Sequence, residues 1–188
     1  MGAPGSPARA AREPGDGAAR EPSARERLLL ERDAEVAAMD LAVTATAAGE
    51  GRMLVVEGPA GIGKSRLLAR ARTQAQAAGL LTCSARGSEL EQAFPFGVVR
   101  QLLEQQVATG GAALMDGVAA GAHPVFAPPG EGAGEGASPG GRGDASFAVL
   151  HGLYWLCVNL SALRPLALVV DDLHWCDRPS LRFLAYLA

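Results

Sequence analysis

The sequence predicts an α/β fold with a parallel β-sheet, and three short apolar runs carry this prediction. The runs cover residues 53–57, 80–85 and 166–170, and they alternate with longer segments whose apolar side chains recur at helical spacing. Such alternation is typical of buried parallel strands joined by helices. The first run leads into a glycine-rich turn and the last ends in two aspartates. Both features suit the carboxyl ends of parallel strands, which face a ligand crevice.

The glycine-rich turn is the most specific motif. Residues 58–65 read GPAGIGKS and fit the phosphate-binding P-loop, with the run 53–57 before them as a buried strand and a helix from Arg66 after them. The backbone N–H groups of such a loop and the helix N-terminus cradle phosphate oxygens, while the lysine reaches the β- and γ-phosphates and the serine binds Mg²⁺. The expected phosphate-binding residues are Gly58, Pro59, Ala60, Gly61, Ile62, Gly63, Lys64 and Ser65.

Lys64 is the sole lysine among 17 basic residues. A compact ammonium fits inside a phosphate loop and a planar guanidinium does not, so this one exception to an arginine-only composition favours a functional role. The alternative, a glycine-rich turn that carries a lysine by chance, is set aside.

The two aspartates at the end of the third apolar run are candidates for the carboxylates that P-loop chemistry requires beside the phosphates. The run 166–170 is predicted as a fully buried parallel strand that delivers Asp171 and Asp172 beside the phosphates. We expect Asp171 to join the Mg²⁺ shell with Ser65, and Asp172 to act as the catalytic residue that orients or deprotonates the attacking water. The alternative is two aspartates that merely end a strand.

The remaining pattern predicts one domain over residues 25–188, after a disordered tail at 1–24 and with a mobile Gly/Pro-rich insertion at about 124–145. A short helix is expected within residues 110–121. The longer helices are expected from Glu31 or Arg32 to about Ala48, from the P-loop to Gly79, from Val98 to about Val107, from Phe147 to about Leu163 with Asp144 or Ser146 as N-cap, and from Ser180 to Ala188.

Composition excludes several classes of protein. A net charge of −3 indicates no strongly basic nucleic-acid surface. The N-terminus lacks the apolar core of a signal peptide, and no apolar run is long enough to cross a membrane. Three cysteines without metal-like spacing favour a reducing cytoplasm, with Cys157 and Cys176 as small buried side chains.

Four segments together resemble a known family. The P-loop, RGSELE at 86–91, FPFG at 94–97 and LVVDDLHW at 168–175 are similar to the AAA-type ATPase module of large LuxR-type bacterial transcriptional regulators, which are STAND NTPases. The resemblance runs from about Leu28 to the last residue. It implies a three-layer αβα P-loop NTPase fold, ATP and Mg²⁺ as ligands, and an ATP-driven switch. Glu31 and Arg32 stand where the family often has a Gly-Arg pair that contacts adenine.

The same resemblance implies that the fold is incomplete. The family's C-terminal strands and lid are missing, including the strand that lies between the P-loop strand and the acid-bearing strand, and DNA would be contacted only through an absent helix-turn-helix. We therefore expect one of two arrangements: a gap or groove between the strand at 53–57 and the acid-bearing strand, or a collapse of the two strands in an order that differs from that of the family. In neither case should Val55 pair with Val169 in a well-formed, stable sheet. The chain should be marginally stable and prone to aggregate, with hydrolysis near background, and self-association is left open. The other hypotheses are a small-molecule kinase or other metabolic NTPase, and a truncated fragment without nucleotide activity.

Overall fold

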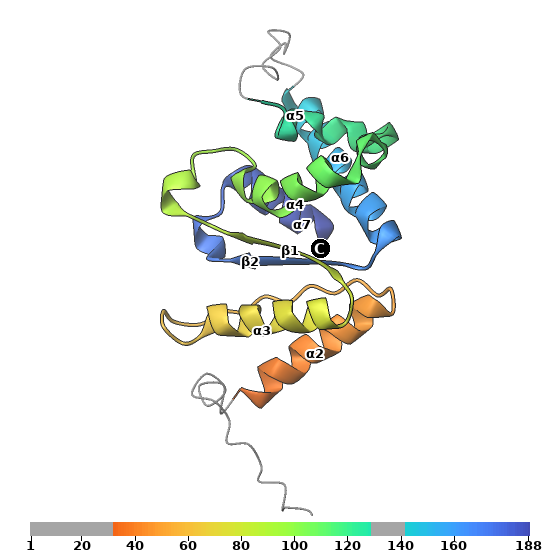
Figure 1. The fold of residues 1–188 in the computed structure, drawn as a ribbon. Helices are drawn as coiled ribbons and strands as arrows, with labels where there is room; N and C mark the ends of the chain where they lie inside the picture. The colour runs from red at the N-terminus through yellow and green to blue at the C-terminus, as the bar shows by residue number, and fades with distance from the viewer. Residues whose placement is uncertain (1–31, 129–141) are drawn as a thin grey trace, which may run out of the picture.

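The computed structural model describes residues 32–128 and 142–188, with helices on both sides of a small parallel sheet (Figure 1). The predicted tail and residues 129–141 of the predicted insertion lie outside these ranges. The α/β class and the parallel sheet are confirmed. A complete three-layer P-loop fold remains a prediction.

The sheet of the described residues has two strands, β1 (Leu81–Arg86) and β2 (Leu166–Asp171). They pair in parallel with a register that runs from Leu81 opposite Leu166 to Arg86 opposite Asp171. These strands confirm the second and third apolar runs. Because the register aligns both carboxyl ends, Arg86 and Asp171 end at the same edge of the sheet.

One face of the sheet packs on the main core. Cys83 and Ala85 of β1 are buried there, and Leu168 and Val170 of β2 pack against the same cluster. Phe183 and the leucines of the neighbouring helices fill the rest of this core. Every residue of β2 is only half-buried, so the prediction of a fully buried strand was wrong. The reason is that β2 has a neighbouring strand on one side only in the described parts of the chain.

The predicted strand at 53–57 is not formed. These residues belong to no strand, and Met53, Leu54 and Val55 expose 53, 50 and 67% of their surface. As expected, Val55 is not paired with Val169, whose partner across the sheet is Ser84. An isolated strand gains no ladder hydrogen bonds, so an apolar run alone does not hold this segment in a sheet.

Helices α2 (Asp33–Ala47) and α3 (Lys64–Ala77) lie on the other side of the sheet (Figure 1). Both match their predicted ranges closely. α2 has little buried surface, with Met39 as its buried residue. α3 begins within the P-loop, runs back under the sheet, and anchors itself through Leu67 and Ala75, which are buried.

The core-side helices are α4 (Gly97–Gly110), α6 (Arg142–Leu163) and α7 (Arg178–Leu187). α6 starts before the predicted Phe147, so Asp144 and Ser146 lie inside the helix and the prediction that one of them caps it was wrong. Gly152 of α6 allows this helix to approach the backbone of Gly121 and Ala122, where an added Cβ would clash. That contact packs the middle of α6 closely against the backbone around Gly121.

Residues 112–126, which follow α4, contain more helical structure than predicted. They include the 3₁₀ helices η2 (Ala112–Met115) and η3 (Gly117–Ala122) and the short helix α5 (His123–Phe126). The mobile insertion was predicted at about 124–145, but residues 124–126 belong to α5 and residues 142–145 belong to α6, so both of its predicted boundaries were wrong. Val125 is buried and ties α5 to the core, a contact that the Gly/Pro-rich composition around it did not reveal.

The three cysteines are free and buried. Burial raises the pKa of the Cys157 thiol to about 12 and that of Cys176 to about 11. The buried state of Cys157 and Cys176 agrees with the prediction that they act as small apolar side chains.

These shifts predict a loss of stability in alkali. An unfolded thiol ionises near 9.0, whereas Cys157 stays protonated to about pH 12, so the folded state loses stability as pH rises between these values. Urea midpoints measured from pH 8 to 11 should fall steadily. In Cys157→Ala the midpoint should be lower at pH 8 and fall less steeply; an equal slope in both proteins would contradict this assignment.

Candidate functional site

The P-loop residues form a compact turn at the N-terminus of α3. Gly61 and Gly63 have φ of 78° and 95°, a left-handed backbone that glycine adopts without strain. An added Cβ at either position would meet nothing within 4 Å, so the turn needs glycine there for its backbone angles rather than for space. Gly63 is the N-cap residue of α3, and its carbonyl accepts hydrogen bonds from the N–H groups of Arg66 and Leu67.

Lys64 folds back into this turn. Its Nζ donates hydrogen bonds to the carbonyl oxygens of Gly58, at 2.8 Å, and Pro59, at 2.9 Å. The ammonium therefore lies against the start of the loop rather than in open solvent. A positive charge at this place, next to the N-terminus of α3, favours a bound anion.

The two aspartates lie at the carboxyl end of β2, in different conformations. Asp171 is the last residue of the strand, and its Oδ1 accepts a hydrogen bond from the backbone N–H of Asp172 at 2.9 Å. Asp172 has φ 50° and ψ 47°, which is left-handed and costly for a residue with a side chain. The chain turns here into η4 (Leu173–Trp175), so the two carboxylates leave the strand in different directions.

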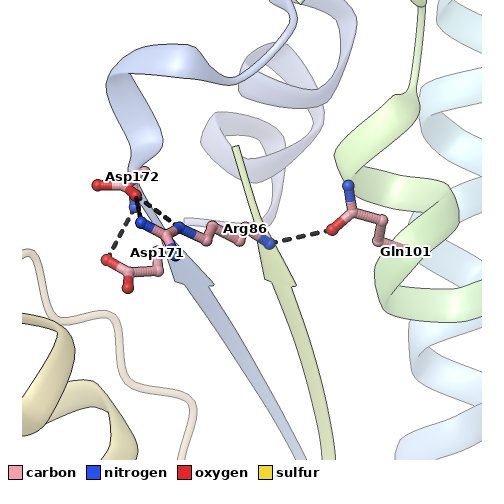
Figure 2. A network of polar contacts seen from close by, with 4 residues as sticks. All are labelled: Arg86, Gln101, Asp171 and Asp172. Carbon is pink, nitrogen blue, oxygen red and sulfur yellow. Dashed lines mark hydrogen bonds and ion pairs between the residues drawn. The ribbon is translucent and has the colours of Figure 1, made fainter. Parts of the chain in front are cut away.

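Arg86 holds the side chain of Asp172. Its Nε and Nη2 both lie 2.7 Å from Oδ2 of Asp172, and Figure 2 shows the guanidinium spanning from the end of β1 to the end of β2. The hydrogen bond and the charge of Asp172 raise the pKa of Arg86 above its ordinary value. Helix α4 contributes through Gln101, whose Oε1 accepts a hydrogen bond from the backbone N–H of Arg86 at 3.0 Å.

A cavity of about 390 Å³ joins α3 to the end of the sheet. Ser65 lines it from the first turn of α3, and Asp171 lines it from the end of β2, so the structure brings these two predicted Mg²⁺ ligands to one space. Asp172 is not among its lining residues. The others are Leu68, Ala69, Arg72, Ser84, Ala85, Arg86, Gln101 and Val169.

The residue types at this site are suitable for binding ATP and Mg²⁺. Within residues 32–128 and 142–188, no group of three or more His, Cys, Asp or Glu side chains could hold a metal ion by protein ligands alone. Mg²⁺ is usually held by one or two protein oxygens, phosphate oxygens and water. The Ser65 hydroxyl and the Asp171 carboxylate, which line one cavity, are such a donor set, and Lys64 directly precedes Ser65 in the chain.

Two residues next to the site escaped the sequence analysis. The ion pair between Arg86 and Asp172 was not foreseen, because strand order and register decide which side chains meet. Asp177 was also missed. It is 2% exposed, and its carboxylate accepts hydrogen bonds from the backbone N–H groups of Phe96, Val98 and Ser180. The signal for it was an aspartate two residues before Pro179, a pattern typical of a helix N-cap followed by proline in the first turn.

A family model described as an AAA ATPase domain matches residues 28–188, which is most of the chain. Searches of curated proteins and of solved structures found no match. Among the helices of the described residues, none combines the length and the apolar character needed to cross a membrane.

Proposed function

Because the chain belongs to the AAA ATPase domain family, we propose that it binds ATP with Mg²⁺ at the P-loop and the end of β2. In this proposal residues 58–65 bind the phosphates, and Ser65 and Asp171 hold Mg²⁺. Bound Mg²⁺ would neutralise charge on the phosphates. Asp172 would orient or deprotonate the attacking water once its side chain is free to do so.

The position of Lys64 carries this proposal. The sole lysine of the chain lies inside the glycine turn, hydrogen-bonded to Gly58 and Pro59, at the N-terminus of a fourteen-residue helix. Its ammonium and the N–H groups of the first turn of α3 offer positive charge at one place. Asp171 lines the same cavity as Ser65, the last residue of this motif, and would supply a second oxygen ligand for the metal there.

The direct test is a calorimetric titration of the purified chain with ATP, with and without Mg²⁺. We expect saturable binding with one site per chain, strengthened by Mg²⁺ and weakened by high salt, because the attraction is electrostatic. The absence of binding under both conditions would favour a fragment without nucleotide activity. Release of phosphate in the same samples measures any hydrolysis.

We further propose that ATP binding acts as a switch within a LuxR-type regulator, as the family resemblance implies. This segment itself would make no contact with DNA, in line with its net charge of −3. Limited proteolysis with ATP and with ADP tests the switch, since two conformational states should give different fragments. Identical fragments with both nucleotides would count against it.

The different places of the two aspartates predict different mutant behaviour. Asp171→Asn should weaken the Mg²⁺ dependence of ATP binding, because its carboxylate lines the cavity that Ser65 lines. Asp172→Asn should leave ATP bound and stop whatever hydrolysis the unaltered chain has. Calorimetry and phosphate release measure both. Identical behaviour of the two variants would argue against separate roles.

A further inference from the structure

The cavity between α3 and the sheet extends beyond the P-loop. Of the motif at 58–65, only Ser65 is among its lining residues. The other lining residues of α3 are Leu68, Ala69 and Arg72, which recur with Ser65 at helical spacing and therefore share one face of the helix. Because seven positions separate Ser65 from Arg72, the cavity follows about two turns of α3, or about 10 Å. This length leaves room beyond the proposed metal ligands.

The sheet side of the cavity is largely polar. Ser84 and Arg86 of β1 lie opposite Val169 and Asp171 of β2 in the register, and all four line the cavity. A sheet face that packs on a helix normally carries apolar side chains that fill the space between the two layers. Small and polar side chains take their place here, and a volume of about 390 Å³ remains. A space of this size is typical of a ligand pocket.

Arg72 brings a positive charge to this cavity that no carboxylate matches. The other lining arginine, Arg86, is paired with Asp172. Within the parts of the chain that the structure describes, every ion pair involves an arginine other than Arg72. The lining carboxylate, Asp171, is the proposed ligand of Mg²⁺ and would be matched by the metal. Arg72 is therefore available to bind an anionic group of a ligand in this space.

Helix geometry directs the side chain of Arg72 back toward Ser65. The Cα–Cβ bonds of a helix lean toward its N-terminus, so a long side chain covers the turn before its own Cα. In P-loop proteins Mg²⁺ bridges the second and third phosphates, which places the third phosphate next to the metal. We propose that Arg72 binds the terminal phosphate of ATP and that this contact lets the site distinguish ATP from ADP. The inference rests on the proposed function, because it concerns the same ligand.

A switch driven by ATP requires a contact of this kind. A ligand shifts a conformational equilibrium only through the difference in its affinity for the two states. ATP and ADP differ by the terminal phosphate alone, so the residue that distinguishes them must bind that phosphate. The Lys64 ammonium of the proposed site serves the second and third phosphates together. Arg72 enters the cavity two turns further along α3, where it would meet the third phosphate and not the first two.

The test is a calorimetric titration of the unaltered chain and of Arg72→Ala with ATP and with ADP, each with Mg²⁺. We expect the ATP affinity to fall about tenfold and the ADP affinity to change by less than about twofold, because a hydrogen bond between charged groups is lost with ATP alone. Tenfold is at the lower end of the range for such bonds, as suits an exposed arginine. Arg72→Lys keeps the charge without the forked donor and should lose less. Arg70→Ala is the matched control, since it removes an exposed arginine of α3 that does not line the cavity.

The ratio of the two affinities separates this role from a structural one. A loss of stability would lower the apparent affinity for ATP and ADP alike. An equal fall for both nucleotides, or no fall for either, would overturn the inference and leave the proposed function intact. So would a fall of the same size in Arg70→Ala, because positive charge anywhere on α3 would then explain the effect. If the unaltered chain binds neither nucleotide, the proposed function and the inference fail together.

Discussion

Lys64→Ala should weaken ATP binding by at least about a hundredfold. The ammonium donates to the carbonyls of Gly58 and Pro59 and can exchange those bonds for phosphate oxygens. Charge-assisted hydrogen bonds contribute about 1.5–3 kcal/mol each, so the loss of two corresponds to a hundredfold or more in affinity. Calorimetric titration of both proteins with Mg²⁺ and ATP measures the difference.

Two further variants make this test specific. Lys64→Arg keeps the charge but places a planar guanidinium in a turn built around an ammonium, so it should restore little binding. Arg70→Ala removes an exposed positive charge from the same helix and should leave the affinity nearly unchanged. Melting curves of all three should be close to that of the unaltered chain, since the bonds of Lys64 are exposed. Unchanged affinity in Lys64→Ala would show that the P-loop assignment is wrong.

The sequence was most informative where one segment determines its own structure. The strands β1 and β2 and the helices α2, α3 and α4 follow from apolar runs and helical spacing, and all were predicted within a few residues. The run at 53–57 shows the limit of this reasoning. Its composition is that of a strand, yet Met53 to Val55 stay exposed, because a strand also requires a neighbour to pair with.

The residues of the candidate site also fall into those that could be predicted from the sequence and those that could not. The turn at 58–65 and the two aspartates could be predicted, because spacing along the chain determines the P-loop and the end of a strand. The pairing of Arg86 with Asp172 could not, because these residues are 86 positions apart and meet only through the register of β1 with β2. Asp177 belongs to this second group, since its partners Phe96 and Val98 lie at the start of α4, 81 and 79 positions away in the chain.

Asp177→Ala should be the most destabilising of the substitutions considered. The carboxylate is buried and serves two helices at once: Oδ1 accepts the N–H groups of Phe96 and Ser180, both at 2.8 Å, and Oδ2 accepts that of Val98 at 3.2 Å. Phe96 has a left-handed backbone with φ 59°, which this bond helps to hold. Truncation would leave three N–H groups without their acceptor and remove the N-cap of α7.

We expect this change to cost about 3–5 kcal/mol in the free energy of unfolding, since hydrogen bonds to a charged group contribute about 1.5–3 kcal/mol each and part of the loss is recovered by water. A small domain has only about 5–15 kcal/mol in total, so urea unfolding should shift strongly. Asp177→Asn keeps one acceptor oxygen and should lose less, which provides a measurable protein if the alanine variant does not fold. Asp116→Ala, at an exposed position that makes no side-chain cap hydrogen bond, should change stability by less than about 0.5 kcal/mol. Equal urea midpoints for Asp177→Ala and Asp116→Ala would show that the carboxylate does not join α4 to α7.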